Sequence, residues 1–138
     1  MCYLSHRNWP TGEVVGKPLP VNGSLGCISY NPTGKQLAAV LNSSVVLLEA
    51  SSGRTISQSN SKDAKKVVWS PDGRYLGVVL KGRIALCDAK SLKEIITVPI
   101  EYACSVTFSP DAKFVVFGSW SKGQVWEVAT LLKTNTSK

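Results

Sequence analysis

The heptapeptide Ser-Pro-Asp-Gly-Arg-Tyr-Leu at Ser70–Leu76 has two counterparts in the chain. They are Asn-Pro-Thr-Gly-Lys-Gln-Leu at Asn31–Leu37 and Ser-Pro-Asp-Ala-Lys-Phe-Val at Ser109–Val115. The three prolines are residues 32, 71 and 110, so both intervals are 39 residues. A fixed period of this size indicates one supersecondary unit repeated in space, whose apolar faces are buried by stacking on neighbouring units. The repeat therefore decides the fold class.

Apolar runs keep the same register around each proline turn. A run that ends in an aromatic residue precedes the turn, a second run follows it, and a third run ends in an acidic residue. The aromatic residues are Tyr30, Trp69 and Phe108, and the acidic residues are Glu49, Asp88 and Glu127. Short β-branched and aromatic runs between turn residues predict strands, and a weaker fourth run at 54–57 and 94–98 adds one more. We expect no helix, because no stretch has helical periodicity, and we expect the three aromatic residues to be buried.

The turn itself has a clear chemistry. Proline sets φ at the first corner, and glycine tolerates the positive φ that follows in many tight turns. Gly34 and Gly73 occupy this position in the first two copies, whereas Ala112 occupies it in the third. We therefore expect the third turn to be of a type that needs no positive φ.

Three antiparallel strands and a fourth, repeated at this interval, resemble a blade of the WD-repeat β-propeller family. The resemblance runs from about residue 26 to residue 128 and includes the Ser-Pro-Asp-Gly turn. The position of the family's Trp-Asp dipeptide reads Leu48-Glu49, Cys87-Asp88 and Trp126-Glu127. The family's Gly-His dipeptide is missing, since His6 is the only histidine of the chain. The family's buried histidine–aspartate network therefore cannot form, and we expect the blades to depend more on apolar packing.

The resemblance implies an all-β fold, a partial β-propeller of about three four-stranded antiparallel blades. The chain divides into an N-terminal segment with the outer strand of a blade (1–24), two blades (25–63 and 64–102), and an incomplete third blade with a polar tail (103–138). Three blades are too few for the usual ring of 4–8, and the terminal blades would expose apolar sides and strand edges. The chain would be part of a longer propeller, complete another protein's propeller, or pair with a second copy. We favour the first two together over the third, and we expect the isolated chain not to be a well-behaved monomer.

Composition narrows the class of protein. The 138 residues are 43% hydrophobic, which is enough for a core. No apolar run approaches the ~20 residues that span a membrane, and no secretory signal is visible. The four cysteines lack metal-ligand spacing, and we expect no disulfides. These features predict an intracellular protein with no membrane contact, in the cytoplasm, with the nucleus left open.

The net charge is +7, and part of the excess is clustered in and before the second repeat. The clustered residues are Lys62, Lys65, Lys66, Lys81 and Arg83, and Lys90 and Lys93 add to them in the same repeat. They predict either a basic rim for nucleic acid or an acidic protein, or a solvated population that keeps a β protein soluble. The 12 lysines against 4 arginines favour the second interpretation, because arginine is the commoner base and phosphate ligand.

The residues offer little chemistry for an enzyme. One histidine cannot supply both a base and a metal site, and no nucleotide-binding or metalloprotease motif is present. The three acidic residues that end the third runs repeat at equivalent positions, which indicates turn hydrogen bonding rather than a pair of catalytic carboxylates. We expect a protein that is not an enzyme and binds no cofactor or metal.

Two tryptophans are candidate contact residues. Trp120 lies in the loop before a third strand, beside Lys122, where the other copies carry Asn42 and Lys81. It is either a loop anchor folded on its own blade or an interface hot spot, a role in which tryptophan is enriched. Trp9 is a candidate contact between chains or blades. Trp126 holds the family's tryptophan position and should pack between blades.

The leading hypothesis is a non-catalytic WD-repeat-like scaffold that mediates protein–protein contacts within a larger assembly. Its candidate partner-binding residues are Trp9, Trp120, Lys122, Lys62, Lys65, Lys66, Lys81 and Arg83. The partners would be proteins, further propeller blades or a second copy. The alternative is an RNA-associated subunit of a ribonucleoprotein complex that uses the basic loops, so nucleic acid is the second choice of partner.

Overall fold

The computed structural model describes residues 2–7, 14–21 and 24–136, with side chains over residues 24–133. The first sheet contains β3 (Leu25–Tyr30), β4 (Gln36–Leu41), β5 (Ser44–Glu49) and β6 (Thr55–Gln58). The second contains β7 (Ala64–Trp69), β8 (Tyr75–Leu80), β9 (Arg83–Asp88) and β10 (Glu94–Pro99). The third contains β11 (Ala103–Phe108), β12 (Phe114–Ser119) and β13 (Gly123–Glu127). Each is an antiparallel meander that follows the order of the sequence.

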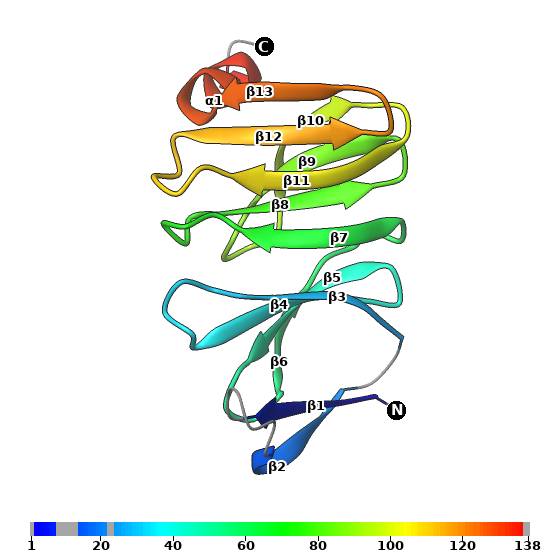
Figure 1. Cartoon of the computed structure of the whole chain (residues 1–138), viewed down its shortest axis with the longest axis vertical. Helices are drawn as coiled ribbons and strands as arrows, with labels where there is room; N and C mark the ends of the chain where they lie inside the picture. The colour runs from blue at the N-terminus through cyan, green and yellow to red at the C-terminus, as the bar shows by residue number, and fades with distance from the viewer. Residues whose placement is uncertain (1, 8–13, 22–23, 137–138) are drawn as a thin grey trace.

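The three sheets stack one after another along the longest axis of the molecule (Figure 1). Their first strands lie on the same side of the stack, because β3 contacts β7, and β11 contacts both β7 and β8. The described part of the chain is therefore a partial β-propeller, nearly all β. Each sheet is a blade, with its first strand innermost.

The described part of residues 1–24, where we expected one outer strand, contains two strands. Strand β1 (Cys2–Arg7) pairs antiparallel with β2 (Val14–Val21) in a sheet of their own. This hairpin lies at the N-terminal end of the stack (Figure 1).

The expectation of no helix was wrong. Helix α1 spans Val128–Thr136, over part of the predicted polar tail, and contacts β10 and β13. Val128 and Leu131 are 7% and 1% exposed, and Leu132 packs against the same cluster. Their spacing at i, i+3 and i+4 places all three on one face of a helix. A stripe this short is a weak sequence signal, and burial against a neighbouring blade is what stabilises it.

The expectation for the third turn was also wrong. Ala112 has φ +62°, in the same left-handed region as Gly34 and Gly73, at +76° and +75°. The hydrogen bonds of the turn explain why. The Ala112 N–H donates to the Ser109 carbonyl at 2.9 Å, and the Phe114 N–H donates to Ser109 Oγ at 3.0 Å. These contacts hold the backbone in place whichever residue stands at the turn.

Two clusters of buried side chains join the blades. One lies between the first and second blades, and the other between the second and third, where α1 closes it. Of the described glycines, Gly77 in β8 makes the tightest contact between blades, where an added Cβ would lie 2.7 Å from Val106 Cγ2 and 3.3 Å from Phe108 Cε2. Glycine at this position lets β11 approach the second blade.

The three aromatic residues that end the inner strands differ in burial. Trp69 is 7% exposed and donates from Nε1 to the Ser29 carbonyl of the first blade at 3.1 Å. Phe108 is half-buried against the second blade. Tyr30 is 49% exposed, so its predicted burial was wrong. Trp69 and Phe108 each pack on the blade that precedes their own. Tyr30 lies in the first four-stranded sheet, so no such blade of the described chain precedes it to cover the ring.

Replacing Ala112 by glycine should raise the free energy of unfolding by about 1 kcal/mol, because a left-handed φ is unfavourable for a residue with a Cβ. Gly73→Ala should lower it by a similar amount, since its nearest neighbour, Pro32 Cδ, lies at 3.8 Å and does not clash. Urea denaturation of both variants measures the effect. Two shifts of the same sign would contradict the shared turn geometry.

Replacing Gly77 by alanine should destabilise the chain by about 1–3 kcal/mol, because the new methyl overpacks the contact with Val106. Gly26→Ala is the matched control, because its Cβ would lie 3.6 Å from Val40 Cγ1, an ordinary contact. Thermal melts of the two variants make the comparison. Equal melting temperatures would show that β11 does not approach as closely as described.

Candidate interaction surfaces

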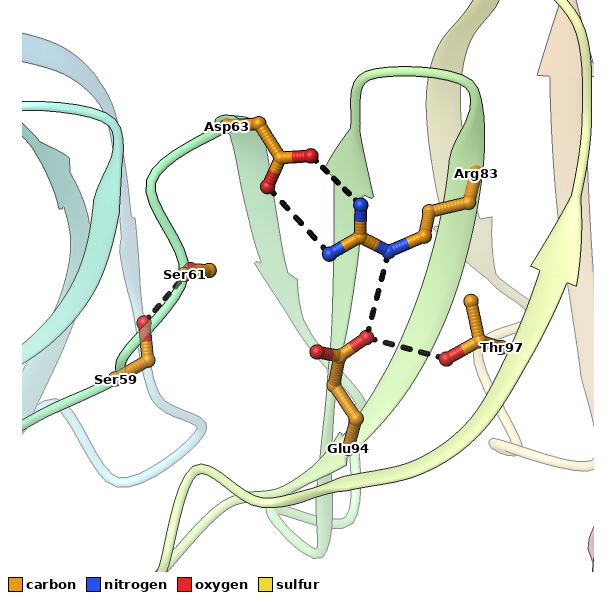
Figure 2. A network of polar contacts seen from close by, with 6 residues as sticks. All are labelled: Ser59, Ser61, Asp63, Arg83, Glu94 and Thr97. Atoms are coloured by element: carbon orange, nitrogen blue, oxygen red, sulfur yellow. Dashed lines mark hydrogen bonds and ion pairs between the residues drawn. The ribbon is translucent and has the colours of Figure 1, made fainter.

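A polar network occupies one end of the second blade (Figure 2). Arg83, at the start of β9, donates from Nη1 to Asp63 Oδ2 at 2.6 Å and from Nη2 to Asp63 Oδ1 at 3.4 Å. Its Nε lies 3.7 Å from Glu94 Oε1, and Thr97 Oγ1 donates to that oxygen at 3.1 Å. The hydrogen bond to Asp63 raises the pKa of Arg83 further above its ordinary value. One guanidinium thus joins the connection before β7 to β9 and β10.

The connection between the first two blades, residues 59–63, is also tied to the first blade. Ser44 Oγ donates to the Ser61 carbonyl, and the Val45 N–H donates to Ser59 Oγ at 3.0 Å. The hydroxyls of Ser59 and Ser61 lie 2.9 Å apart (Figure 2). The expectation that the blades depend mainly on apolar packing therefore needs an addition, because side-chain hydrogen bonds hold this connection to both blades.

A pocket of about 370 Å³ lies beside this network, between the first two blades. Its lining includes Ser59, Leu80, Arg83, Cys87 and Glu94. Burial raises the pKa of the Cys87 thiol to about 12, so the thiol is protonated at neutral pH and is a poor nucleophile. No group of three or more histidine, cysteine, aspartate or glutamate residues within the described ranges could hold a metal ion.

The structure places the predicted basic residues at one end of the blades. Lys62, Lys65 and Lys66 precede or begin β7, and Lys81 and Arg83 flank the β8–β9 turn. Trp120 and Lys122 occupy the β12–β13 turn at the same end, while Trp9 lies outside the described residues. The lysines are exposed, but the guanidinium of Arg83 forms ion pairs with the carboxylates of Asp63 and Glu94. Arg83 is thus a structural residue rather than a free basic group.

Sequence reasoning missed the residue that Trp120 contacts. Tyr102, in the β10–β11 turn, stacks on Trp120 with ring centroids 4.8 Å apart and planes inclined by 10°. Trp120 is 79% exposed and Tyr102 58% exposed, so the ring is not folded into its own blade. The repeat could have indicated this contact. Tyr102 and Trp120 are the counterparts, 39 residues later, of Asp63 and Lys81, which lie on adjacent turns of the second blade.

The two ends of the stack expose side chains that the repeat buries elsewhere. On β13, Val125 is 69% exposed, whereas its repeat counterparts Leu86 and Leu47 are 0% and 2% exposed. Phe114 is 41% exposed, and Val116 alternates with Val115 and Phe117 along β12. We name Phe114, Val116 and Val125 the C-terminal face. Strand β13 is also an edge strand, because the third sheet has no fourth strand among the described residues.

At the other end, the inner strand β3 carries a second exposed group. Ile28 is 40% exposed and Tyr30 49%, whereas their counterparts in β7, Val67 and Trp69, are 3% and 7% exposed. Leu37, Ala39 and Val46 of the same sheet are buried in a cluster of their own, so at this end it is Ile28 and Tyr30 of the inner strand that lie where a neighbouring blade would stand.

A family model described as "Eukaryotic translation initiation factor eIF2A" matches residues 2–129. The chain belongs to the eIF2A family. The family is WD40-like and propeller-forming, which supports the resemblance to WD-repeat propellers. A search of curated proteins found no match.

Solved structures similar to this eIF2A-family chain are propellers. They include hydrazine synthase of Kuenenia stuttgartiensis (18% identity, TM-score 0.71, 81% of this chain and 37% of that chain). A eukaryotic initiation factor gives 19% identity and a TM-score of 0.67 over 85% of this chain and 33% of that one. U3-55K gives 18% identity and a TM-score of 0.70 over 81% of this chain and 38% of that chain. At these identities the likeness shows the fold alone, and the chain spans about a third of each structure.

One negative result concerns membranes. Within the described residues, the structure has no helix with the length and apolar character needed to cross a bilayer.

Replacing Arg83 by lysine should lower the free energy of unfolding by about 1 kcal/mol, because lysine keeps the charge but loses the fork that binds Asp63. The figure is small because the side chains are about a third exposed. Arg54→Lys is the matched control, since the Arg54 side chain is 73% exposed beside Glu49. We expect it to change stability less, and urea denaturation at low and high salt compares the two. A larger loss for Arg54→Lys would refute the role of Arg83.

Proposed function

We propose that the chain is a non-catalytic interaction module that builds propeller blades onto a different polypeptide through its C-terminal face. The observation that carries the proposal is the exposure of Val125, whose counterpart Leu86 is fully buried by the next blade. Membership of a propeller family supports an interaction module of this kind.

The contact would repeat the packing inside the chain. The face that Leu86 belongs to is covered by the third blade through side chains such as Val106 and Val115. A sheet stacked on the C-terminal face in the same way would cover Phe114, Val116 and Val125. Removing such apolar area from water is the main driving force for association.

The edge of the third sheet adds a second mode of contact. Strand β13 has β12 on one side and no further strand on the other in the described chain, whereas β5 and β9 each have a fourth strand. Such an edge accepts an extended segment by strand addition, with backbone hydrogen bonds that do not depend on side chains.

Packing considerations favour a different polypeptide over a second copy. At the two internal contacts, a small residue, Ala38 or Gly77, faces Val67 or Val106. In a head-to-tail pair of copies, Val116 would stand in the place of Gly77 and Ile28 in the place of Val106. Two bulky side chains would meet where the internal contact leaves no room for even a methyl group on Gly77.

A photo-crosslinking residue at position 125, introduced in the full-length protein in its own cells, tests the proposal. We expect discrete adducts with another polypeptide, and Phe114→Ser in the same protein should reduce their yield by about tenfold or more, since it removes apolar contact area. The same group at exposed position 90, on the opposite end of β9, is the matched control and should give none. A protein that gives no adduct at position 125, or adducts only with a second copy of itself, would refute the proposal.

A further inference from the structure

The aromatic pair, Tyr102 and Trp120, is not required to build the turns that carry it. At the same positions in the second blade, the Lys81 N–H donates to the Asp63 carbonyl at 3.2 Å. In the first blade, the Asn42 N–H donates to the Ser24 carbonyl at 3.0 Å. Backbone hydrogen bonds thus close the equivalent turns twice without aromatic side chains, and the third blade places two exposed rings there.

The aromatic pair also has two features that are energetically unfavourable for the folded chain. Tyr102 has φ +57°, a left-handed conformation that is unfavourable for an aromatic residue. Trp120 keeps 79% of its surface exposed to water. Costs of this kind concentrate at functional sites, so the pair is a candidate binding site.

The geometry suits a flat ligand. The two rings are nearly parallel, at 10°, and each covers one face of the other. With most of Trp120 exposed, its second face is open to solvent. A third planar group would extend the stack at low entropic cost, because the two rings already stack on each other.

Two lysines lie on the turns at and beside the aromatic pair. Lys122 is exposed two residues after Trp120. Lys81 is exposed on the neighbouring turn, where the Gly82 carbonyl accepts a hydrogen bond from the Ile100 N–H at 3.0 Å. Neither lysine takes part in an ion pair found among the described residues. Glu101 is the exposed acidic residue beside them, so the local balance is positive.

We propose that the aromatic pair binds an unpaired base of a single-stranded nucleic acid, with Lys81 and Lys122 holding the flanking phosphates. Stacking platforms combined with basic side chains are the usual basis of single-strand binding. A protein partner suits the site less well, because lysine is depleted in protein interfaces and two exposed lysines lie on these turns. The proposal uses a different surface from the C-terminal face and does not depend on it.

Fluorescence anisotropy on the full chain tests the proposal with labelled oligouridine and oligoadenosine RNA of about 12 nucleotides, within the range of single-strand sites. An abasic phosphodiester of equal length measures the backbone contribution alone. We expect tighter binding of the two base-bearing probes. Trp120→Ala should weaken that binding by about 5- to 150-fold and leave the abasic probe unchanged, whereas Trp120→Phe should keep part of the affinity.

The lysines have their own readout. Lys122→Gln should lower affinity for both kinds of probe and reduce the slope of log affinity against log salt by about one phosphate contact. Lys90→Gln is the matched control, because Lys90 is exposed at the opposite end of β9, and it should have no effect. Trp120→Ala should melt at the same temperature as the unaltered chain, since the ring is exposed.

Three results would overturn the proposal. They are no binding of the RNA probes, equal binding of base-bearing and abasic probes, and unchanged binding by Trp120→Ala. Binding of a labelled acidic peptide in place of RNA would assign the pair to a protein partner and overturn it too. Val125→Ser, which alters the C-terminal face, should leave RNA binding unchanged, so the outcome is separable from that of the proposed function.

Discussion

Each blade of this chain is an antiparallel sheet with two apolar faces, and a sheet of this kind is stable only when both faces are covered. The contact between Gly77 and Val106 is where this constraint is tightest, because the two blades meet there without room for a methyl group. Strand β11 lies beside β8 at this contact, and the cluster that includes Val106 also buries Leu86 and receives Val128 and Leu131 of α1. The exposed residues of the C-terminal face are the same constraint left unmet, whereas at the other end Leu37, Ala39 and Val46 are buried and Ile28 and Tyr30 of the inner strand are exposed.

Polar contacts then determine how the blades connect. The segment 59–63 is bound to the first blade through Ser59 and Ser61 and to the second through Asp63 and Arg83. Packing of apolar faces sets the spacing between two blades but does not fix the path of the segment that connects them. Hydrogen bonds are directional, so they fix that path.

The equivalent turns of the three blades show how one scaffold carries different surfaces. In the first and second blades, a backbone hydrogen bond joins the segment before the inner strand to the turn between the second and third strands. In the third blade, the stacked rings of Tyr102 and Trp120 lie at the same two positions. The strands hold the turn ends at the same separation whichever residues are present. The turn residues are therefore open to change without loss of the fold, which is why binding residues gather in such loops.

The 39-residue period, the alternation of apolar residues and the Ser-Pro-Asp-Gly turn determined the sheets, because strand pairing and tight turns depend on residues close in the sequence. The same local reasoning placed Trp120 and Lys122 in one turn. Only the tertiary structure decided that Tyr102 lies against Trp120, that Arg83 is held by Asp63 and Glu94, and that Tyr30 is exposed. It also decided the helix at Val128–Thr136 and the positive φ of Ala112. These features depend on which blade, turn or cluster stands opposite each residue, and that is set by packing in three dimensions rather than by neighbours along the chain.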